Sequence, residues 1–179
     1  MPHNSADVER ILREKIRAIP DYPKRGIIFR DITPLLKDKN ATKICIDEMA
    51  KRLSRYKIDY VVGIEARGFI FGSLLAYKLG AGFVPARKKG KLPYSKISRD
   101  YALEYGNETL EMHDDAVERQ SNVVVVDDLL ATGGTASAAG ALVESLGGRV
   151  VAYAFVVELK DLGGRSKLTG KDIVSIVTY

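Results

Sequence analysis

The sequence predicts an α/β protein built on a central, mainly parallel β-sheet that is flanked by helices. Short runs rich in valine and isoleucine recur from residue 59 onward. These runs are almost continuously apolar, which is typical of parallel strands buried on both faces. Stretches with helical spacing of apolar residues separate the runs, as in consecutive strand–helix–strand units. The length of 179 residues suits one domain, and 46% hydrophobic and 28% charged residues are ordinary globular values.

The N-terminal third predicts two helices around an irregular segment. The first helix is expected from Ser5 to Ile19, where apolar residues recur at helical spacing, Ser5 serves as N-cap and Pro20 ends the helix. Residues 21–38 contain two prolines and a glycine, so an irregular backbone is expected there. A second helix is expected from about Thr42 to Tyr56.

The alternating part of the chain follows. Strands are expected at residues 59–64, 82–87, 122–128, 149–159 and, at the C-terminus, 172–179. Helices are expected at residues 68–80 and 135–146, each of which ends at glycine.

The stretch from Leu92 to Glu118 interrupts this pattern. It is polar, contains three tyrosines and includes EYGNE, which resembles a hairpin turn. An insertion between two core strands of an α/β domain is a common position for an active-site lid. We therefore expect residues 92–118 to form a flexible lid.

Composition excludes several classes of protein. Cys45 is the single cysteine, and no apolar run approaches the roughly 18 residues that a membrane span needs. The charged N-terminus lacks the apolar core of a signal peptide, so a reducing, cytoplasmic location without membrane partners is expected. With two histidines and no Cys/His cluster, a dedicated metal site is not expected. The net charge of +5 suits a nucleic-acid binder or an enzyme with polyanionic small substrates.

One motif, VVVVDDLLATGGT, carries most of the chemistry. Asp127 and Asp128 end a buried strand, and ligands of open α/β sheets bind beyond the carboxyl ends of strands. Two glycines then allow positive φ and close backbone approach before a helix begins. The turn's N–H groups and threonine hydroxyls can hold a phosphate without a lysine. The phosphate-binding candidates are Ala131, Thr132, Gly133, Gly134 and Thr135.

The two carboxylates indicate what else the ligand carries. Adjacent acids removed from water without partners cost several kcal/mol each, so they face donors or cations. A sugar diol offers two hydroxyl donors, and a phosphate one carbon away would reach the glycine turn. The motif therefore favours a ribose 5-phosphate. The alternative is that Asp127 and Asp128 only cap the turn and the following helix.

The motif also resembles the phosphoribosyl-diphosphate (PRPP) motif of the type I phosphoribosyltransferases, and DDLLATGGT is similar to the form in members that use adenine. Further blocks at compatible spacing support the resemblance: DYPKRGIIFRDITPLL, GIEARGFIFG, RKKGKLP, YALEYGNETLE and VVELKDLGGRSKL. The resemblance implies the type I fold, with residues 1–36 as an N-terminal helix and base-binding hood. It also implies transfer of the 5-phosphoribosyl group of PRPP to adenine in purine salvage, which gives AMP and diphosphate.

By resemblance, the other blocks supply the remaining site residues. Diphosphate binding is assigned to Glu65, Ala66, Arg67, Arg87 and Lys91. Phe29 would stack on adenine, and the backbone of Ile28 and Arg30 would read its edge. Glu104 would be the acid/base and Tyr105 would close over the site. The alternatives are a surface role for Arg67, a core role for Phe29 and a solvated strand position for Glu104.

The resemblance also concerns cofactor and partners. It implies Mg²⁺ carried mainly by PRPP or diphosphate, with no dedicated protein ligands, and a homodimer without nucleic acid. Related enzymes carry a cis peptide in the loop that corresponds to Glu65-Ala66. Two alternatives keep the fold: a phosphoribosyltransferase for another purine base, or a regulator that senses PRPP and binds nucleic acid. Arg25, Tyr94 and the lack of a Pro-Gly turn near Gln120 depart from the family pattern.

Overall fold

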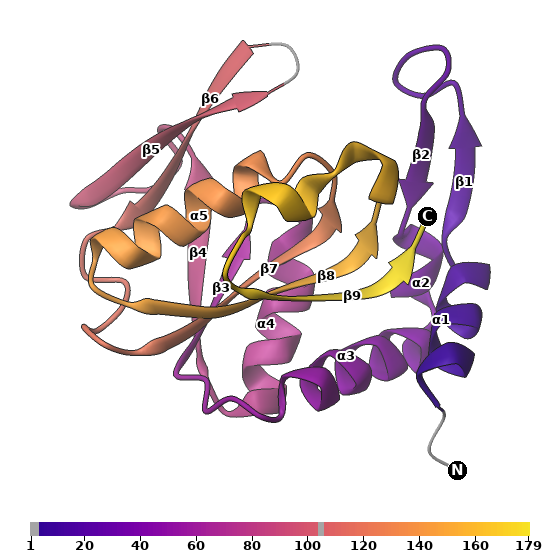
Figure 1. Ribbon diagram of the computed structural model, residues 1–179, viewed down its shortest axis with the longest axis horizontal. Coiled ribbons are helices and arrows are strands. Elements are labelled where there is room, and N and C mark those ends of the chain that lie inside the picture. Colours follow the sequence, from indigo (N-terminus) through magenta and orange to yellow (C-terminus); the bar gives the residue numbers. More distant parts are fainter. Residues whose placement is uncertain (1–3, 104–105) are drawn as a thin grey trace.

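A computed structural model describes residues 4–103 and 106–179 (Figure 1). Within them, a seven-stranded sheet has the strand order β5-β6-β4-β3-β7-β8-β9, and β1 and β2 form a separate two-stranded sheet. The strands are β1 Arg17–Pro20, β2 Ile28–Asp31, β3 Tyr60–Ile64, β4 Gly82–Lys88, β5 Lys96–Leu103, β6 Gly106–His113, β7 Asn122–Leu130, β8 Arg149–Glu158 and β9 Asp172–Thr178. The helices are α1 Ser5–Glu14, α2 Thr33–Lys37, α3 Lys39–Leu53, α4 Arg67–Leu79 and α5 Gly134–Ser145, with 3₁₀ turns η1 Lys160–Leu162 and η2 Gly164–Lys167.

The central sheet is mainly parallel, as predicted. Strands β4, β3, β7, β8 and β9 pair in parallel, while β6 and β5 are antiparallel additions at one edge. The five predicted core strands all form, and their ends differ from the predicted ones by at most two residues. The sheet therefore carries its carboxyl ends along one edge of the molecule.

Helices cover both faces of the sheet, so the protein has two apolar layers. Helices α1, α3 and α4 pack on one face and α5 on the other. Strand β7 explains why its sequence is continuously apolar. Val124 and Val126 face the first layer and Val123 and Val125 the second, and all four are fully buried.

The N-terminal helix is shorter than predicted. It ends at Glu14, and its cap is Asn4, whose Oδ1 accepts from the Asp7 N–H at 2.8 Å. Ser5 instead donates its hydroxyl to Glu48 on α3, at 2.8 Å. The predicted helix is wrong beyond residue 14, because residues 17–20 pair with β2 as strand β1.

The segment at 21–38, which was expected to be irregular, contains β2 and the short helix α2. The next helix, α3, starts at Lys39 and ends at Leu53, three residues before each predicted limit. Its start is set by Asp38, whose Oδ1 accepts from the N–H groups of Asn40 at 3.0 Å and Ala41 at 3.1 Å. The β1–β2 hairpin projects beyond the sheet (Figure 1).

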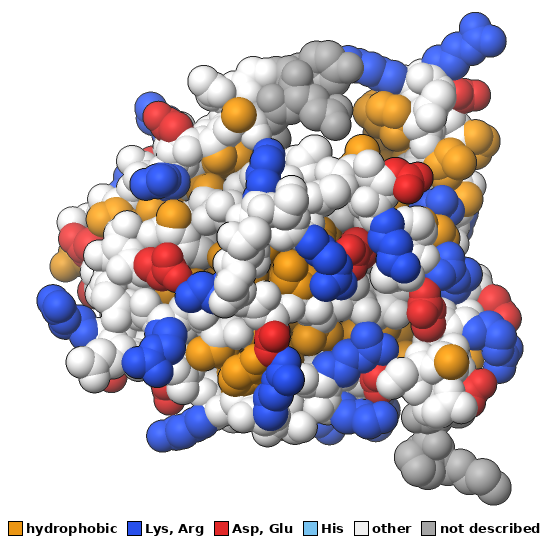
Figure 2. Space-filling model, viewed as in Figure 1, with side chains coloured by type: hydrophobic (Ala, Val, Ile, Leu, Met, Phe, Trp, Pro, Cys, Tyr) orange, Lys and Arg blue, Asp and Glu red, His pale blue; other side chains and the backbone are white. Residues whose placement is uncertain are grey.

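The insertion at 92–118 contains the second projecting hairpin. Strands β5 and β6 pair antiparallel from Lys96 opposite His113 to Leu103 opposite Gly106, in line with the predicted turn. The two hairpins rise on either side of the edge where β7 meets α5 (Figure 1). None of the described helices combines the length and apolar character needed to cross a bilayer. On the face in Figure 2, lysines and arginines are interspersed with acidic side chains and form no continuous basic stripe.

Candidate active site

Two loops meet at the carboxyl edge of the sheet. Strands β3 and β7 are neighbours, with Gly63 opposite Val126, so residues 65–67 lie beside Asp127 and Asp128. Gly68 allows this approach, because a Cβ there would stand 2.8 Å from the Val126 carbonyl oxygen and 2.9 Å from Asp127 Oδ1. The Glu65-Ala66 peptide is cis, as the family resemblance implies.

Arg67 joins the two loops. Its Nε lies 3.0 Å from Oδ2 of Asp128, whose side chain is only 6% exposed. The contact is an ion pair without hydrogen-bond geometry, so this buried oxygen has no hydrogen-bond donor among the described residues. Burial raises the pKa of both Asp127 and Asp128, and their mutual proximity raises that of Asp127 further. The pair is therefore costly without a ligand and ready to accept hydroxyl donors.

The glycine turn forms the start of α5. Gly133 is the N-cap with φ +78°, and a Cβ there would stand 2.4 Å from the carbonyl oxygen of Gly164 in η2. Of the two glycines that allow positive φ, Gly133 adopts it, and Gly134 is the first residue of the helix. A Cβ on Gly134 would stand 3.1 Å from the Ala102 carbonyl oxygen. The first N–H groups of α5 have no partner within the helix and can serve an anion.

Glu65 gathers the predicted diphosphate-binding cations. Its Oε1 lies 3.0 Å from Arg87 Nη2 and 3.0 Å from Lys91 Nζ, and its Oε2 accepts from the Lys88 N–H at 3.1 Å. Burial by itself raises the pKa of Glu65, but these hydrogen bonds outweigh burial and lower the pKa to about 2. The carboxylate therefore stays charged and neutralises cations that the sequence assigned to the substrate.

A cavity of about 270 Å³ lies between these groups. It brings together the predicted residues Glu65, Ala66, Arg67, Asp127, Asp128 and Thr135.

Three further polar lining residues were missed by the sequence analysis: Tyr101, Glu108 and Lys88. Tyr101 donates to Glu108 at 2.8 Å, and Lys88 pairs with the same carboxylate at 2.8 Å. Burial and the Glu108 hydrogen bond raise the pKa of Tyr101 to about 12. The available signal was weak, because Lys88 sits in a basic run and Tyr101 in a polar insertion.

A second cavity, of about 750 Å³, separates the β1–β2 hairpin from the glycine turn. Ile28 and Arg30 line it on the hairpin side, and Ala131 and Thr132 on the other. The half-buried ring of Phe29 packs edge-on against Tyr22, with 5.2 Å between the ring centres. The guanidinium carbon of Arg67 lies 5.3 Å from the centre of the Phe29 ring. Phe29 lies outside both apolar layers of the described chain, which argues against a core role.

Two predicted residues, Glu104 and Tyr105, lie outside the described residues. Strand residues Leu103 and Gly106 flank them in the β5–β6 hairpin. Within residues 4–103 and 106–179, no group of three or more His, Cys, Asp or Glu side chains is arranged to hold a metal ion.

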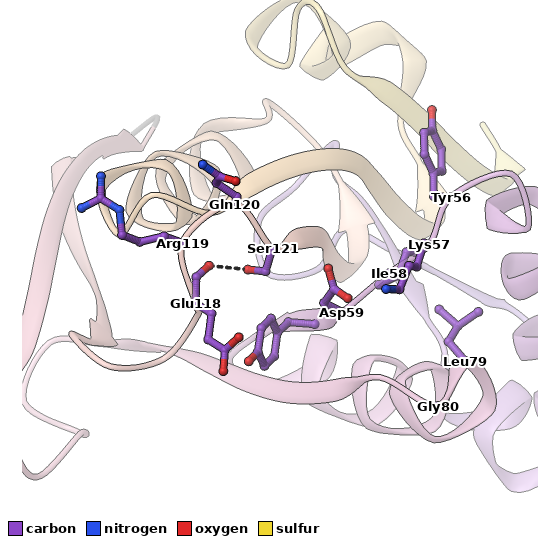
Figure 3. Close-up of a pocket in the computed structure, with 11 residues that line it drawn as sticks. Tyr56, Lys57, Ile58, Asp59, Leu79, Gly80, Glu118, Arg119, Gln120 and Ser121 are labelled. Carbon is purple, nitrogen blue, oxygen red and sulfur yellow. Dashed lines mark hydrogen bonds between the residues drawn. The ribbon is translucent and has the colours of Figure 1, made fainter.

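Another cavity, of about 640 Å³, lies at the opposite end of the sheet (Figure 3). Asp59 and Ser121, which precede β3 and β7, line it together with Gly80 after α4. Figure 3 shows Ser121 donating to the Glu118 carbonyl, a bond of 2.6 Å. Because ligands of parallel sheets bind at the carboxyl ends of strands, this cavity is a poor candidate for the active site.

Comparison with known proteins agrees with this geometry. Residues 34–176 match the family model for the phosphoribosyl transferase domain. The adenine phosphoribosyltransferase of Brachyspira hyodysenteriae is 55% identical over 168 residues, which cover 94% of this chain and 99% of the relative.

Solved structures agree as well. The adenine phosphoribosyltransferase of Thermoanaerobacter pseudethanolicus aligns with a TM-score of 0.93 at 54% identity, covering 95% of this chain and 99% of that one. The Saccharomyces cerevisiae enzyme, solved with an imino-altritol bisphosphate and adenine, aligns with a TM-score of 0.90 at 40% identity, covering 96% and 99%.

Proposed function

The chain belongs to the adenine phosphoribosyltransferases of the type I phosphoribosyltransferase family, and from that premise we propose which residues carry the reaction. The activity is transfer of the 5-phosphoribosyl group from PRPP to adenine, which gives AMP and diphosphate in purine salvage. In the reaction, the bond between the ribose C1 and diphosphate breaks and C1 bonds to a nitrogen of adenine. The relatives are adenine phosphoribosyltransferases, which favours adenine over another purine base and an enzyme over a nucleic-acid-binding regulator.

The observation that carries the assignment is the pairing of an acidic strand end with a glycine-capped helix. Asp127 and Asp128 hold the two ribose hydroxyls, whose donors offset the burial of the carboxylates. The turn at Ala131–Thr135 holds the 5′-phosphate through N–H groups at the start of α5. Both contributions are mainly positioning, because they fix C1 relative to the base.

The leaving diphosphate is held by the cations around Glu65. Arg67, Arg87, Lys91 and the loop amides that begin at Ala66 bind it; Glu65 contributes through its carboxylate, because its own N–H donates to the Ala86 carbonyl oxygen at 2.9 Å. As negative charge grows on the diphosphate, its oxygens take over part of the ion pairing that Arg87 and Lys91 make with Glu65. Stabilisation that strengthens as charge develops lowers the barrier to C1–O cleavage.

Adenine occupies the cavity beneath the β1–β2 hairpin. The backbone groups of Ile28 and Arg30, which line this cavity, read the hydrogen-bonding edge of adenine. Stacking on the ring is assigned to Phe29, which lies between them in β2 and is not itself a lining residue of the cavity. The apolar lining from Ile27, Leu159 and Leu162 suits a flat heteroaromatic ring. We assign residues 1–36 to this hood within a single domain of residues 1–179.

The lid at residues 92–118 supplies the acid/base chemistry. Glu104 acts as the general acid/base that transfers the proton of the purine imidazole nitrogen. Tyr105 closes over the reacting groups. Closure excludes water that would otherwise hydrolyse PRPP. The proposal is supported by Tyr101, four residues before Tyr105, because Tyr101 lines the same cavity as Asp127.

Mg²⁺ is the proposed cofactor. Mg²⁺ keeps several waters and is bound through substrate phosphates with one or two carboxylates, which suits a site with paired carboxylates beside an anion pocket. The buried Oδ2 of Asp128, which has no hydrogen-bond donor among the described residues, fits an outer partner of such an ion. When bound with the diphosphate, the ion neutralises charge on the leaving group.

The proposed assembly is a cytoplasmic homodimer. Ile70, Leu74 and Tyr77 are 41%, 41% and 90% exposed and share one face of α4, next to the Arg67 loop. Light scattering with size-exclusion chromatography tests this: Tyr77→Lys should yield monomer and Tyr94→Lys, an exposed tyrosine elsewhere, should remain dimeric. A monomeric wild type would refute the proposal.

A spectrophotometric assay with PRPP, Mg²⁺ and each purine base tests the residue roles. We expect AMP formation from adenine alone and a loss of about 10²- to 10⁴-fold in kcat/KM for Glu104→Gln. Asp100→Asn, which removes an exposed acid of the same hairpin bonded to Thr109, is the control and should retain activity. Equal activity of the two variants would remove Glu104 from the mechanism.

A further inference from the structure

Tyr179 and Arg30 form an unusual link between the hood and the body of the protein. The guanidinium carbon of Arg30, on β2, lies 3.6 Å from the centre of the Tyr179 ring. Within residues 4–103 and 106–179, the Arg30 side chain makes no hydrogen bond or ion pair, and its Nε is buried without a partner. The ring face is therefore the contact that holds this cation among the described residues.

Tyr179 is itself fixed to the central sheet. Its N–H donates to the Glu158 carbonyl at 2.8 Å, and its carbonyl oxygen accepts from the Lys160 N–H at 2.9 Å. The guanidinium carbon of Arg13, on α1, lies 4.5 Å from the same ring. Tyr179 is thus fixed directly after β9, and Figure 1 shows this end of the chain beside the β1–β2 hairpin.

The hairpin is also linked to the body by the contact of Phe29 with Arg67, at 5.3 Å. Its strands pair only with each other among the described residues and add no strand to the central sheet. Arg30 is next in sequence to Phe29, and both Arg30 and Tyr179 line the 750 Å³ cavity with Ala131 and Thr132. A shift of Arg30 would change the width of that cavity directly.

We propose that Tyr179 is a positioning residue for the base: its ring holds Arg30, and through Arg30 it sets the distance of the hood from the body. This inference rests on the proposed base site. The role belongs to the ring face, since the Tyr179 hydroxyl makes no hydrogen bond to any of the described residues. It acts on the adenine half of the reaction, because Asp127, Asp128 and Thr135 line the other cavity and only Ala131 and Thr132 of the proposed PRPP site share this one.

Steady-state kinetics on a set of purified variants tests the proposal. Tyr179→Leu keeps apolar volume and removes the ring, so KM for adenine should rise about 2- to 30-fold, the range that a cation–π contact supports. Its kcat and KM for PRPP should stay within twofold of wild type. Tyr179→Phe keeps the ring and should match wild type. Tyr56→Leu removes another tyrosine ring near an arginine, 5.1 Å from Arg55, at the far cavity and should leave KM for adenine unchanged.

Two further variants separate this inference from the base-site assignment. Phe29→Leu should raise KM for adenine if Phe29 stacks on the base. The double variant Arg30→Met with Tyr179→Leu should raise KM for adenine no more than the more severe of its two single variants. If Phe29→Leu raises KM for adenine and Tyr179→Leu does not, the positioning role is refuted. If neither does, the base site itself is refuted. Equal effects of Tyr179→Leu on both substrates, or of Leu and Phe at 179, would reduce Tyr179 to general stability and overturn the proposal.

Discussion

The substitution Gly133→Ala tests the glycine turn most sharply. Gly133 caps α5 with φ +78°, and a Cβ there would stand 2.4 Å from the Gly164 carbonyl oxygen. An alanine at this position therefore suffers two separate penalties: an unfavourable backbone conformation and a collision with a fixed backbone atom. The chain offers a control that isolates the first penalty. Gly170 has φ +74° and nothing within 4 Å of its would-be Cβ.

The two penalties have different sizes. A left-handed conformation costs an L-residue about 1 to 2 kcal/mol, and both variants incur this cost. Relief of the collision requires the loop or η2 to move by about 1 Å, and overpacking of this kind costs about 1 to 3 kcal/mol. Gly133→Ala should therefore lower the free energy of unfolding by about 2 to 5 kcal/mol, against about 1 to 2 kcal/mol for Gly170→Ala.

Binding separates the variants further. A displaced turn loses at least one charge-assisted hydrogen bond to the 5′-phosphate, worth about 1.5 to 3 kcal/mol, so affinity should fall about 10- to 150-fold. Calorimetric titration with ribose 5-phosphate measures this loss, and urea unfolding measures stability. Gly170→Ala should bind as wild type does. Unchanged ribose 5-phosphate affinity in a folded Gly133→Ala protein would refute the placement of the phosphate at this turn.

Three other predictions concern the charged groups. Asp128→Asn should raise the melting temperature of the ligand-free protein. Burial raises the pKa of the Asp128 carboxyl, so its ionisation opposes folding at pH values above its ordinary pKa of 3.8. The same variant should lower kcat/KM at least about 10-fold. Scanning calorimetry at pH 5 and 7 measures the change in melting temperature, and an unchanged melting temperature at pH 7 would contradict the prediction. For Glu65 the sign is opposite: its pKa of about 2 lies below the ordinary 4.5, so its stabilisation is full above pH 4.5 and is lost as the pH falls toward 2. Glu65→Gln should therefore be less stable than wild type at pH 7, with a difference that narrows below pH 4.5 in urea titrations. The side chain of Glu158 is 4% exposed and accepts two hydrogen bonds from Arg165, at 2.6 and 2.7 Å. Arg165→Met removes both and should lower the free energy of unfolding in urea by about 1 to 3 kcal/mol. The control Lys160→Met should lower it little.

The sequence predicted the central sheet well because burial on both faces leaves a strong local signal. Strand β7 is apolar at every position from Val123 to Val126, and the acids that follow mark its carboxyl end. The N-terminal hood was predicted poorly for the opposite reason. Residues 15–20 have helical spacing, yet pairing with residues 28–31 makes part of them a strand. Spacing within one segment carries no information about a partner ten residues away.

The candidate site shows the same division. The motif residues could be found from the sequence because each block is contiguous, from Glu65 to Arg67 and from Asp127 to Thr135. The contacts of Gly164 with the glycine turn and of Tyr179 with Arg30 join segments that are far apart in sequence. No spacing rule connects such residues, so they emerge only from the packing of β8, η2 and β9 against the turn.

Acidic side chains beside the proposed anion site are explained by the charge balance of the site. Asp128 pairs with Arg67, and Glu65 pairs with Arg87 and Lys91, so the cations that we propose for diphosphate binding are neutralised within the site. A like-charged cluster would otherwise oppose folding through self-repulsion. In the proposed complex the substrate brings both kinds of partner at once: hydroxyl donors for the aspartates and phosphate oxygens for the cations. Binding as proposed therefore exchanges ion pairs within the site for contacts with the substrate. This exchange favours a ligand that carries a diol and two phosphate groups over either fragment alone, because a fragment breaks pairs that it cannot replace.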